Sequence, residues 1–262
     1  MTTRAASSRA IALSWVISLS VGLTGLAACS EPAGQAERPL VQEFPPGWRY
    51  PPADLPLRAV HGMVVSTDSL ASAAGLSMLQ AGGNAVDAAV ATHFALAVVN
   101  PEAGNIGGGG FLVARMADDT RAALDFREKA PLAASADMYL DAEGRVTDAG
   151  VIGHLASGVP GSVAGMREAW DRFGTLPWSD LLQPAIRLAR DGFVIGPRHL
   201  SSVGAGAETL ERFPSTAAVF LPGGLAPQQG SVFRQPDLAR ALESIAMDGA
   251  AAFYRGWIAD ST

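Results

Sequence analysis

Apolar side chains recur at helical spacing in two consecutive stretches of the chain. Residues 69–80 show this spacing and end just before Gly82, a residue typical of a helix terminus. Residues 85–99 are apolar on nearly every side, yet these fifteen residues are too few to cross a bilayer comfortably. They therefore predict a helix buried in a large core, capped by Asn84 and with Asp87 in its first turn.

Shorter runs with alternating or β-branched apolar residues predict strands. The stretch AVHGMVVSTD, residues 59–68, contains the pair Val64 and Val65 and predicts a buried strand. Residues 111–117 and 121–128 are also strand-like, and a short polar segment separates them. That arrangement predicts an antiparallel hairpin.

The second half of the chain is mostly helical in pattern. Three further helices are expected, over residues 163–173, 178–191 and 235–247. Residues 137–153 are polar and predict a loop, and residues 193–232 are rich in Gly, Pro and Ser and predict an irregular segment. Helices before and after a hairpin indicate an α+β fold, with helices layered on mixed or antiparallel sheet.

The first 56 residues have a different composition. Residues 1–28 begin with arginines followed by an apolar stretch, the pattern of an export signal. Cys29, the only cysteine in the chain, follows directly, and the tetrapeptide LAAC that it completes resembles a bacterial lipidation site. Residues 29–56 are rich in proline and predict a tether. We expect an exported protein of the periplasm or cell envelope, lipid-anchored through Cys29, although an ordinary cleaved signal or an uncleaved anchor would also fit.

Composition and charge narrow the function further. The 262 residues are 48% hydrophobic and carry a net charge of −6, with no long basic run, so we expect no nucleic-acid partner. The histidines show no metal-ligand spacing, and we expect neither a metal site nor a cofactor. They are His61, His93, His154 and His199. His93 falls within the apolar helix and is expected to be a hydrogen-bonded core residue.

Four consecutive glycines, residues 107–110, require a physical explanation because glycine is costly to order. A phosphate-binding loop has glycines between a strand and a helix, whereas here they stand between a helix and a strand. A flexible linker is also a poor fit, since apolar elements flank the run closely. The remaining interpretation is a tight passage where this backbone approaches other backbone or a ligand.

Several segments together resemble one family. The stretch GMVVSTDSLASAAGLSMLQAGGNAVDAAVATHFALAVVNPEAGNIGGGGF is followed in order by LDFREKAP, HLASGVPGSVAG, LLQPAIRLARDGF and QPDLARALESIAMDGAAAFYRG. They resemble the γ-glutamyltransferases, or glutathione hydrolases, from about Arg58 to Gly256. The resemblance implies an N-terminal-nucleophile hydrolase fold, an αββα sandwich, incomplete here. It also implies a precursor that cleaves itself into two subunits, the smaller of which begins with the threonine that attacks γ-glutamyl amides such as glutathione.

The resemblance assigns a role to one residue of this chain. The arginine of the family's DFRE segment binds the α-carboxylate of the glutamyl group, and here it is Arg127. A guanidinium can hold a carboxylate by two parallel hydrogen bonds. The residues alone leave open an internal pair with Asp125 or Glu128.

No segment of the chain matches the family's cleavage site, a threonine pair followed by histidine. We therefore expect no catalytic residue here and interpret residues 57–262 as a partial domain, inactive without the small catalytic subunit. Two alternatives stay open. One is a cephalosporin or glutaryl acylase of the same fold, and the other is a non-catalytic, lipid-anchored protein that binds amino acids.

Overall fold

The computed structural model describes residues 57–262, and the contacts between residues set Arg58–Thr262 apart as one unit. Cys29 and the expected signal and tether lie outside the described residues. Helices make up most of the unit: α1 Ser69–Gln80, α2 Ala85–Val99, α3 Ser162–Phe173, α4 Trp178–Asp191, α5 Pro197–Glu211, α6 Pro214–Phe220, α7 Pro236–Asp248, α8 Ala250–Arg255 and α9 Trp257–Ser261. Two small sheets pair β1 Phe111–Arg115 with β2 Arg121–Asp125 and β3 Phe193–Val194 with β4 Val232–Phe233.

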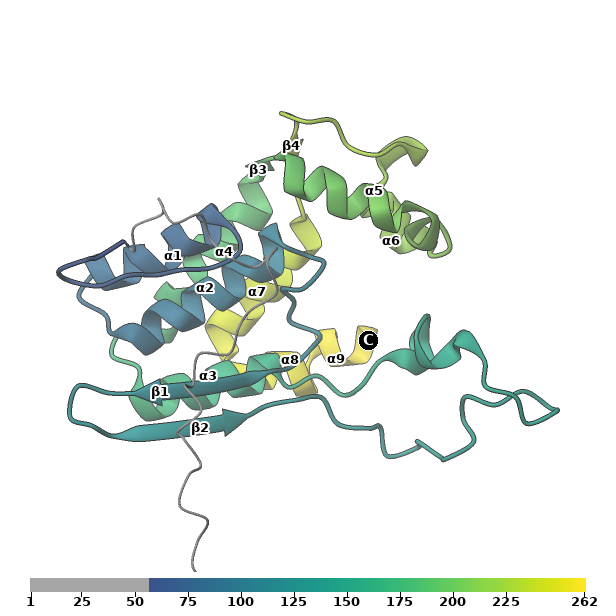
Figure 1. Ribbon diagram of the computed structural model, residues 1–262, viewed down its shortest axis with the longest axis horizontal. Coiled ribbons are helices and arrows are strands. Elements are labelled where there is room, and N and C mark those ends of the chain that lie inside the picture. The colour runs from purple at the N-terminus through teal and green to yellow at the C-terminus, as the bar shows by residue number, and fades with distance from the viewer. Residues whose placement is uncertain (1–56) are drawn as a thin grey trace, which may run out of the picture. The chain divides into compact units, whose positions relative to one another are not determined.

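The core is built around α2, as its sequence predicts. This helix packs against α1 on one side and α4 on another, and α4 packs in turn against α7 (Figure 1). Most of the surface of α2 is buried, and its side chains with no exposure to solvent include Val90, Phe94 and Val98. The side chain of Asn84 accepts hydrogen bonds from the first turn and completes a capping box with Asp87, which fixes where the helix begins.

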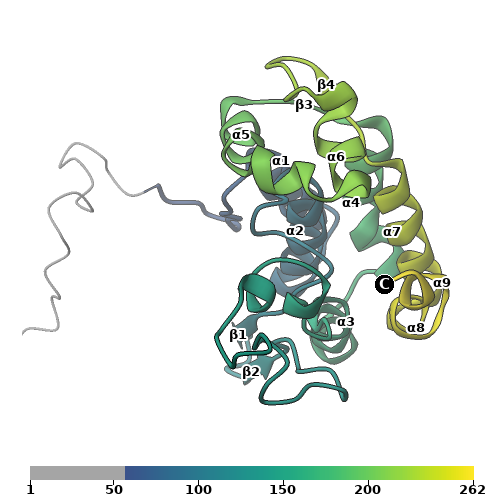
Figure 2. The same ribbon diagram turned by 90° about the vertical axis from the view of Figure 1, so that its right-hand side faces the viewer.

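The predicted hairpin is confirmed over Phe111–Arg115 and Arg121–Asp125. Its strands are antiparallel, and Phe111 is opposite Asp125 at the open end. Side chains alternate between half-buried and exposed along both strands, so the hairpin presents one face to the rest of the unit. The hairpin lies beside α3, at the end of the helical layer opposite α5 and α6 (Figures 1 and 2).

Two predictions of secondary structure are wrong. Residues 59–68 form no strand, and Val65 is exposed, because no other strand in the described part of the chain pairs with this segment. Residues 193–232 are not irregular throughout, because α5 and α6 occupy much of that stretch. Each of these helices begins with proline at its first position, where the missing N–H costs no hydrogen bond.

The remaining helices and the fold class agree with expectation. The helices predicted over residues 163–173, 178–191 and 235–247 are confirmed to within a residue or two at their ends. Helices α8 and α9 follow without having been predicted. The described unit is α+β, with two short antiparallel pairs as its β-structure. Among residues 57–262 no helix combines the length and apolar character needed to cross a bilayer.

Candidate functional site

The glycine run lies against the segment that carries Arg127. Beyond the last pair of the hairpin, Gly110 and Phe126 continue the ladder, with Phe126 N–H donating to the Gly110 carbonyl at 3.0 Å. A Cβ on Gly109 would lie only 2.8 Å from the Arg127 Cα. A side chain at position 109 would therefore push the arginine segment away, which confirms the predicted close approach of backbone to backbone.

A second pair of glycines contacts the same segment from α3. A Cβ on Gly165 would lie 2.5 Å from the Phe126 Cβ, and one on Gly161 would meet the Phe126 backbone. The backbone N–H groups of Gly161 and Ser162 both donate to the Gly108 carbonyl, at 2.7 and 2.9 Å. Hydrogen bonds and close backbone packing therefore connect the glycine run to the start of α3 and to the base of the hairpin. Arg127 extends from this rigid junction rather than from a loose loop.

The side chain of Arg127 is largely exposed, with 63% of its surface accessible. Its Nε donates to a Glu128 carboxylate oxygen at 3.2 Å, and its guanidinium carbon lies 5.8 Å from the centre of the Phe111 ring. The internal pair with Glu128 that the sequence left open is therefore present, whereas Asp125 accepts only the backbone N–H of Arg127, at 3.0 Å. The Glu128 backbone N–H, and after it Arg127, lower the pKa of the Glu128 carboxyl.

An exposed ion pair of this kind contributes little to stability. The guanidinium can therefore exchange Glu128 for the carboxylate of a bound molecule at small cost. Chemically, the site offers one fixed cation beside an aromatic ring at the open end of a hairpin. The role of Arg127 in binding a substrate stays a prediction.

An apolar groove of about 780 Å³ lies between the hairpin and the exposed side of α2, and we call it the α2 groove. Arg127 is not among the residues that line it. Its floor is a stripe of α2 at helical spacing, and its walls come from the hairpin and from the segment that was expected to be a strand. The residues that line the groove include Val65, Ala89, His93, Leu96, Phe111 and Val113.

The histidines behave differently from expectation. The buried Nε2 of His93 lacks the expected hydrogen-bond partner in the described residues, and burial lowers the pKa of His93 to about 4. Its ring instead makes an edge contact with Phe94. Both ring nitrogens of His199 are also buried without a partner, which no pattern in the sequence indicated. Within residues 57–262, no cluster of three His, Cys, Asp or Glu side chains is arranged to hold a metal ion.

Comparisons with known proteins identify relatives of this chain. A model of the gamma-glutamyltranspeptidase family matches residues 71–262. The glutathione hydrolase proenzyme of Escherichia coli (strain K12) is 44% identical over 207 residues, which are 78% of this chain and 36% of the relative. The Acylase ACY 1 proenzyme of Pseudomonas sp. (strain V22) is 45% identical over 208 residues, which are 77% of this chain and 37% of that relative.

A solved structure is similar in fold over the same region. The crystal structure of Helicobacter pylori gamma-glutamyltranspeptidase superposes with a TM-score of 0.77 at 45% identity, and the match covers 79% of this chain and 60% of that chain. The chain thus spans a little over a third of the length of the curated relatives described above.

Proposed function

Because this chain belongs to the gamma-glutamyltranspeptidase family, we propose that it forms part of an enzyme that hydrolyses or transfers the γ-glutamyl group of glutathione and related amides. The single observation that carries this proposal is the position of Arg127. It stands in the LDFREKAP segment, at a junction that three glycines hold in place. A rigidly supported guanidinium is suited to bind the α-carboxylate of a glutamyl donor by two hydrogen bonds.

The proposed chemistry is covalent catalysis. A threonine hydroxyl oxygen attacks the γ-carbonyl carbon, the amide C–N bond breaks, and the amine leaves with a proton that the threonine's own amino group transfers. Water or a second amine then attacks the ester and releases the glutamyl group. The threonine belongs to a cleaved proenzyme and lies outside the residues of this chain, which supply substrate binding and scaffold.

The α2 groove supports a partner for this chain. Apolar side chains at its edge are exposed, including Phe111 and Val113 on β1, and contiguous exposed apolar side chains favour interaction. The segment over residues 59–68 has the composition of a strand and lacks a strand to pair with. We propose that the catalytic subunit covers this groove and supplies the missing strands, and that its backbone offers a hydrogen-bond partner to His93.

The activity can be tested in a chimera in which residues 58–262 replace the matching segment of the Escherichia coli glutathione hydrolase proenzyme. We expect the chimera to cleave itself and to release nitroaniline from γ-glutamyl-p-nitroanilide. Appearance of the cleaved small subunit on a gel controls for maturation. A chimera that matures and yet leaves the γ-glutamyl anilide intact would contradict the proposal.

A second candidate function is an acylase that removes a glutaryl-type group, which the 45% identity to an acylase proenzyme favours. Glutaryl and γ-glutamyl amides share the distal carboxylate that Arg127 would bind, and they differ by the α-ammonium group. Glutaryl-p-nitroanilide in the same assay therefore separates the two functions. Faster turnover of the glutaryl substrate would favour the acylase, and binding of glutamate without turnover of either would favour a non-catalytic binding protein.

We further propose that the protein is exported and anchored in the cell envelope through a lipid on Cys29. The support is the sequence alone, an apolar signal that ends in LAAC. Growth with an alkyne-labelled fatty acid should label the natural chain, and Cys29→Ser should abolish both the label and the membrane association. Equal labelling of the Cys29→Ser variant would rule out this anchor.

A further inference from the structure

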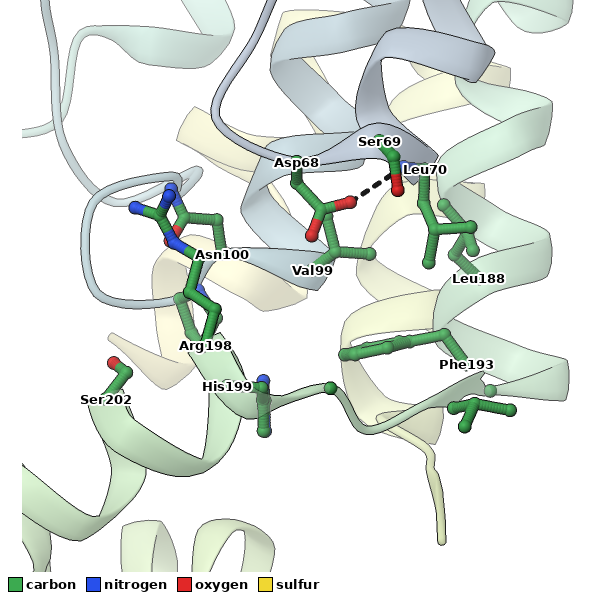
Figure 3. Close-up of a pocket in the computed structure, with 14 residues that line it drawn as sticks. Asp68, Ser69, Leu70, Val99, Asn100, Leu188, Phe193, Arg198, His199 and Ser202 are labelled. Atoms are coloured by element: carbon green, nitrogen blue, oxygen red, sulfur yellow. Dashed lines mark hydrogen bonds between the residues drawn. The ribbon is translucent and has the colours of Figure 1, made fainter. Parts of the chain in front are cut away.

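A second cavity, of about 470 Å³, lies where three helix ends meet (Figure 3). The beginning of α1, the end of α2 and the beginning of α5 surround it, and β3 closes one side. The volume is in the range of small-molecule sites. Polar groups on its wall include Asp68, Arg198 and His199, and Leu70, Val99 and Phe193 supply the apolar part. Arg127 does not line this cavity.

His199 is the unexplained residue of this wall. Its side chain is 5% exposed, and neither ring nitrogen has a hydrogen-bond partner in the described residues. Aromatic neighbours flank it, Phe193 at 5.4 Å and Phe233 at 4.9 Å between ring centres. Burial lowers the pKa of His199, so the ring is neutral near pH 7 and carries one donor and one acceptor nitrogen. Buried polar groups are normally paired, so a partner for this ring is missing.

The charges around the cavity determine which partner fits. Arg198 donates to a Glu102 carboxylate oxygen at 3.0 Å and to the Thr67 carbonyl at 3.1 Å, so Arg198 and Glu102 compensate each other. Asp68 caps α1 by accepting the Leu70 N–H at 2.8 Å through one carboxylate oxygen. Its other oxygen makes no hydrogen bond or ion pair that the described residues record. The net charge left at the cavity is therefore the negative charge of Asp68.

An anion at the start of α5 is the competing interpretation, since its capping residue Gly196 provides no side-chain hydrogen bond. Arg198 already holds the carboxylate of Glu102, however, at 3.0 Å. The place of an anion is thus taken by a residue of the chain itself. A metal ion is also unsuitable, because no triad of metal ligands exists among residues 57–262.

We infer that this cavity binds a small primary ammonium compound with an apolar body. The ammonium group donates hydrogen bonds to the second oxygen of Asp68 and to the acceptor nitrogen of His199. The apolar body packs against Leu70, Val99 and Phe193. This arrangement supplies a partner to the buried imidazole and places a positive charge beside the carboxylate of Asp68.

The test uses ligand-observed saturation-transfer NMR on the full 262-residue chain at pH 7, with n-butylammonium as the probe. The method needs little protein and works whether or not the chain self-associates. n-Butanol and butyrate are matched probes, one neutral and one anionic. We expect saturable binding of n-butylammonium, with binding of the other two probes weaker by about tenfold or more because each lacks the charged donor.

Two variants separate a ligand site from ordinary packing. His199→Phe keeps the aromatic contacts and removes both nitrogens, so folding should be preserved while n-butylammonium binding falls by about tenfold or more. Asp68→Asn keeps the cap of α1, because asparagine caps as well as aspartate, and should weaken binding similarly. Asp180→Asn, in the first turn of α4 and away from the cavity, is the control and should bind like the natural chain.

Three results would overturn the inference. The first is absence of saturable n-butylammonium binding, which would mean that the cavity holds only water. The second is equal binding of butanol or butyrate, which would indicate an apolar or an anion site. The third is unchanged binding in whichever of the two variants retains the circular dichroism spectrum of the natural chain.

Discussion

Asp87 is a fully buried carboxylate that connects two segments distant in the sequence. One oxygen accepts the Asn84 N–H at 2.8 Å and closes the capping box of α2. The other accepts the N–H groups of Thr175 at 3.0 Å and of Leu176 at 3.3 Å, in the turn between α3 and α4. A buried carboxylate is stable only when it accepts several such hydrogen bonds, so Asp87 fixes that turn against the start of α2.

Asp87→Ala should therefore be costly. The substitution leaves several backbone donors without a partner, and we expect the free energy of unfolding to fall by about 2–4 kcal/mol. Urea denaturation of the matured chimera, followed by circular dichroism, measures the loss. Asp180→Ala is the control, since Asp180 is an exposed acid in the first turn of α4, and its loss should cost less than about 1 kcal/mol. Similar losses in the two variants would show that Asp87 acts only as a helix-end charge.

Individual residues were predictable from sequence where their role is local. The capping role of Asp87 follows from its spacing to Asn84, whereas its contact with Thr175 spans 88 positions and could not be foreseen. The same limit applies to His93 and His199. Whether a buried imidazole finds a partner depends on elements far away in the chain, and for these two the described residues provide none.

At the scale of elements, the hairpin is held at its base by close contact with α3. Gly165 is inside α3, and a Cβ there would lie 2.5 Å from the Phe126 Cβ and against its ring. A Cβ on Gly110 would in turn lie 3.1 Å from the Phe126 Cε2, so a second glycine leaves room for the other edge of this ring. The helix and the strand can approach this closely only because position 165 has no side chain.

Gly165→Ala should therefore destabilise the unit even though alanine favours helices. We expect a loss of about 1–3 kcal/mol from overpacking, measured in the matured chimera as a lower midpoint of thermal unfolding. Gly204→Ala is a matched control inside α5, where a Cβ would meet nothing within 4 Å. That variant should gain about 0.5–1 kcal/mol from helix propensity. A stabilised Gly165→Ala variant would mean that the hairpin is not fastened to α3.

Elements with a strong helical period were predicted almost to the residue, because the period reports burial directly. Helix α5 was missed because it contains Gly204 and Gly206, which weaken a helix and resemble a loop pattern. The strand over residues 59–68 was wrongly predicted for the opposite reason. Its composition suits a strand, yet a strand needs a paired neighbour, and the described residues offer none.

At the scale of the whole molecule, the α2 groove is the feature that sets the behaviour of the isolated chain. The apolar helix α2 is buried as predicted over most of its surface, where α1 and α4 cover it, but one stripe of it stays open to the groove. Exposed apolar side chains lie on both walls of the groove, with Val113 of the hairpin 86% exposed and Val65 of the opposite segment 81% exposed. An uncovered surface of this kind favours self-association.

We therefore expect the isolated chain to be poorly soluble and to melt without a sharp, cooperative transition. Val113→Lys should raise the soluble fraction after centrifugation several-fold, because a charge in the groove opposes apolar contacts between copies. Val146→Lys is the control, since Val146 is similarly exposed, at 82%, and does not line the groove. An equal gain from both substitutions would show that added charge alone improves solubility, independent of the groove.

The family was recognisable from the order of its motifs, which extend over most of the chain. The match covers 36% and 37% of the two relatives, so the proposed activity also requires segments outside this match. Arg127 connects this chain to the proposed activity, because it belongs to this chain and is proposed to bind the substrate of the whole enzyme.

The most direct test of that claim is the Michaelis constant of Arg127→Ala in the matured chimera. We predict that the KM for γ-glutamyl-p-nitroanilide rises by about tenfold to a hundredfold, with a smaller change in kcat, because a charge-assisted pair of hydrogen bonds to the substrate is lost. Arg121→Ala, on the same hairpin, should leave the KM unchanged, and Arg127→Lys should recover only part of the binding. A KM in Arg127→Ala equal to that of the unsubstituted chimera would contradict the account.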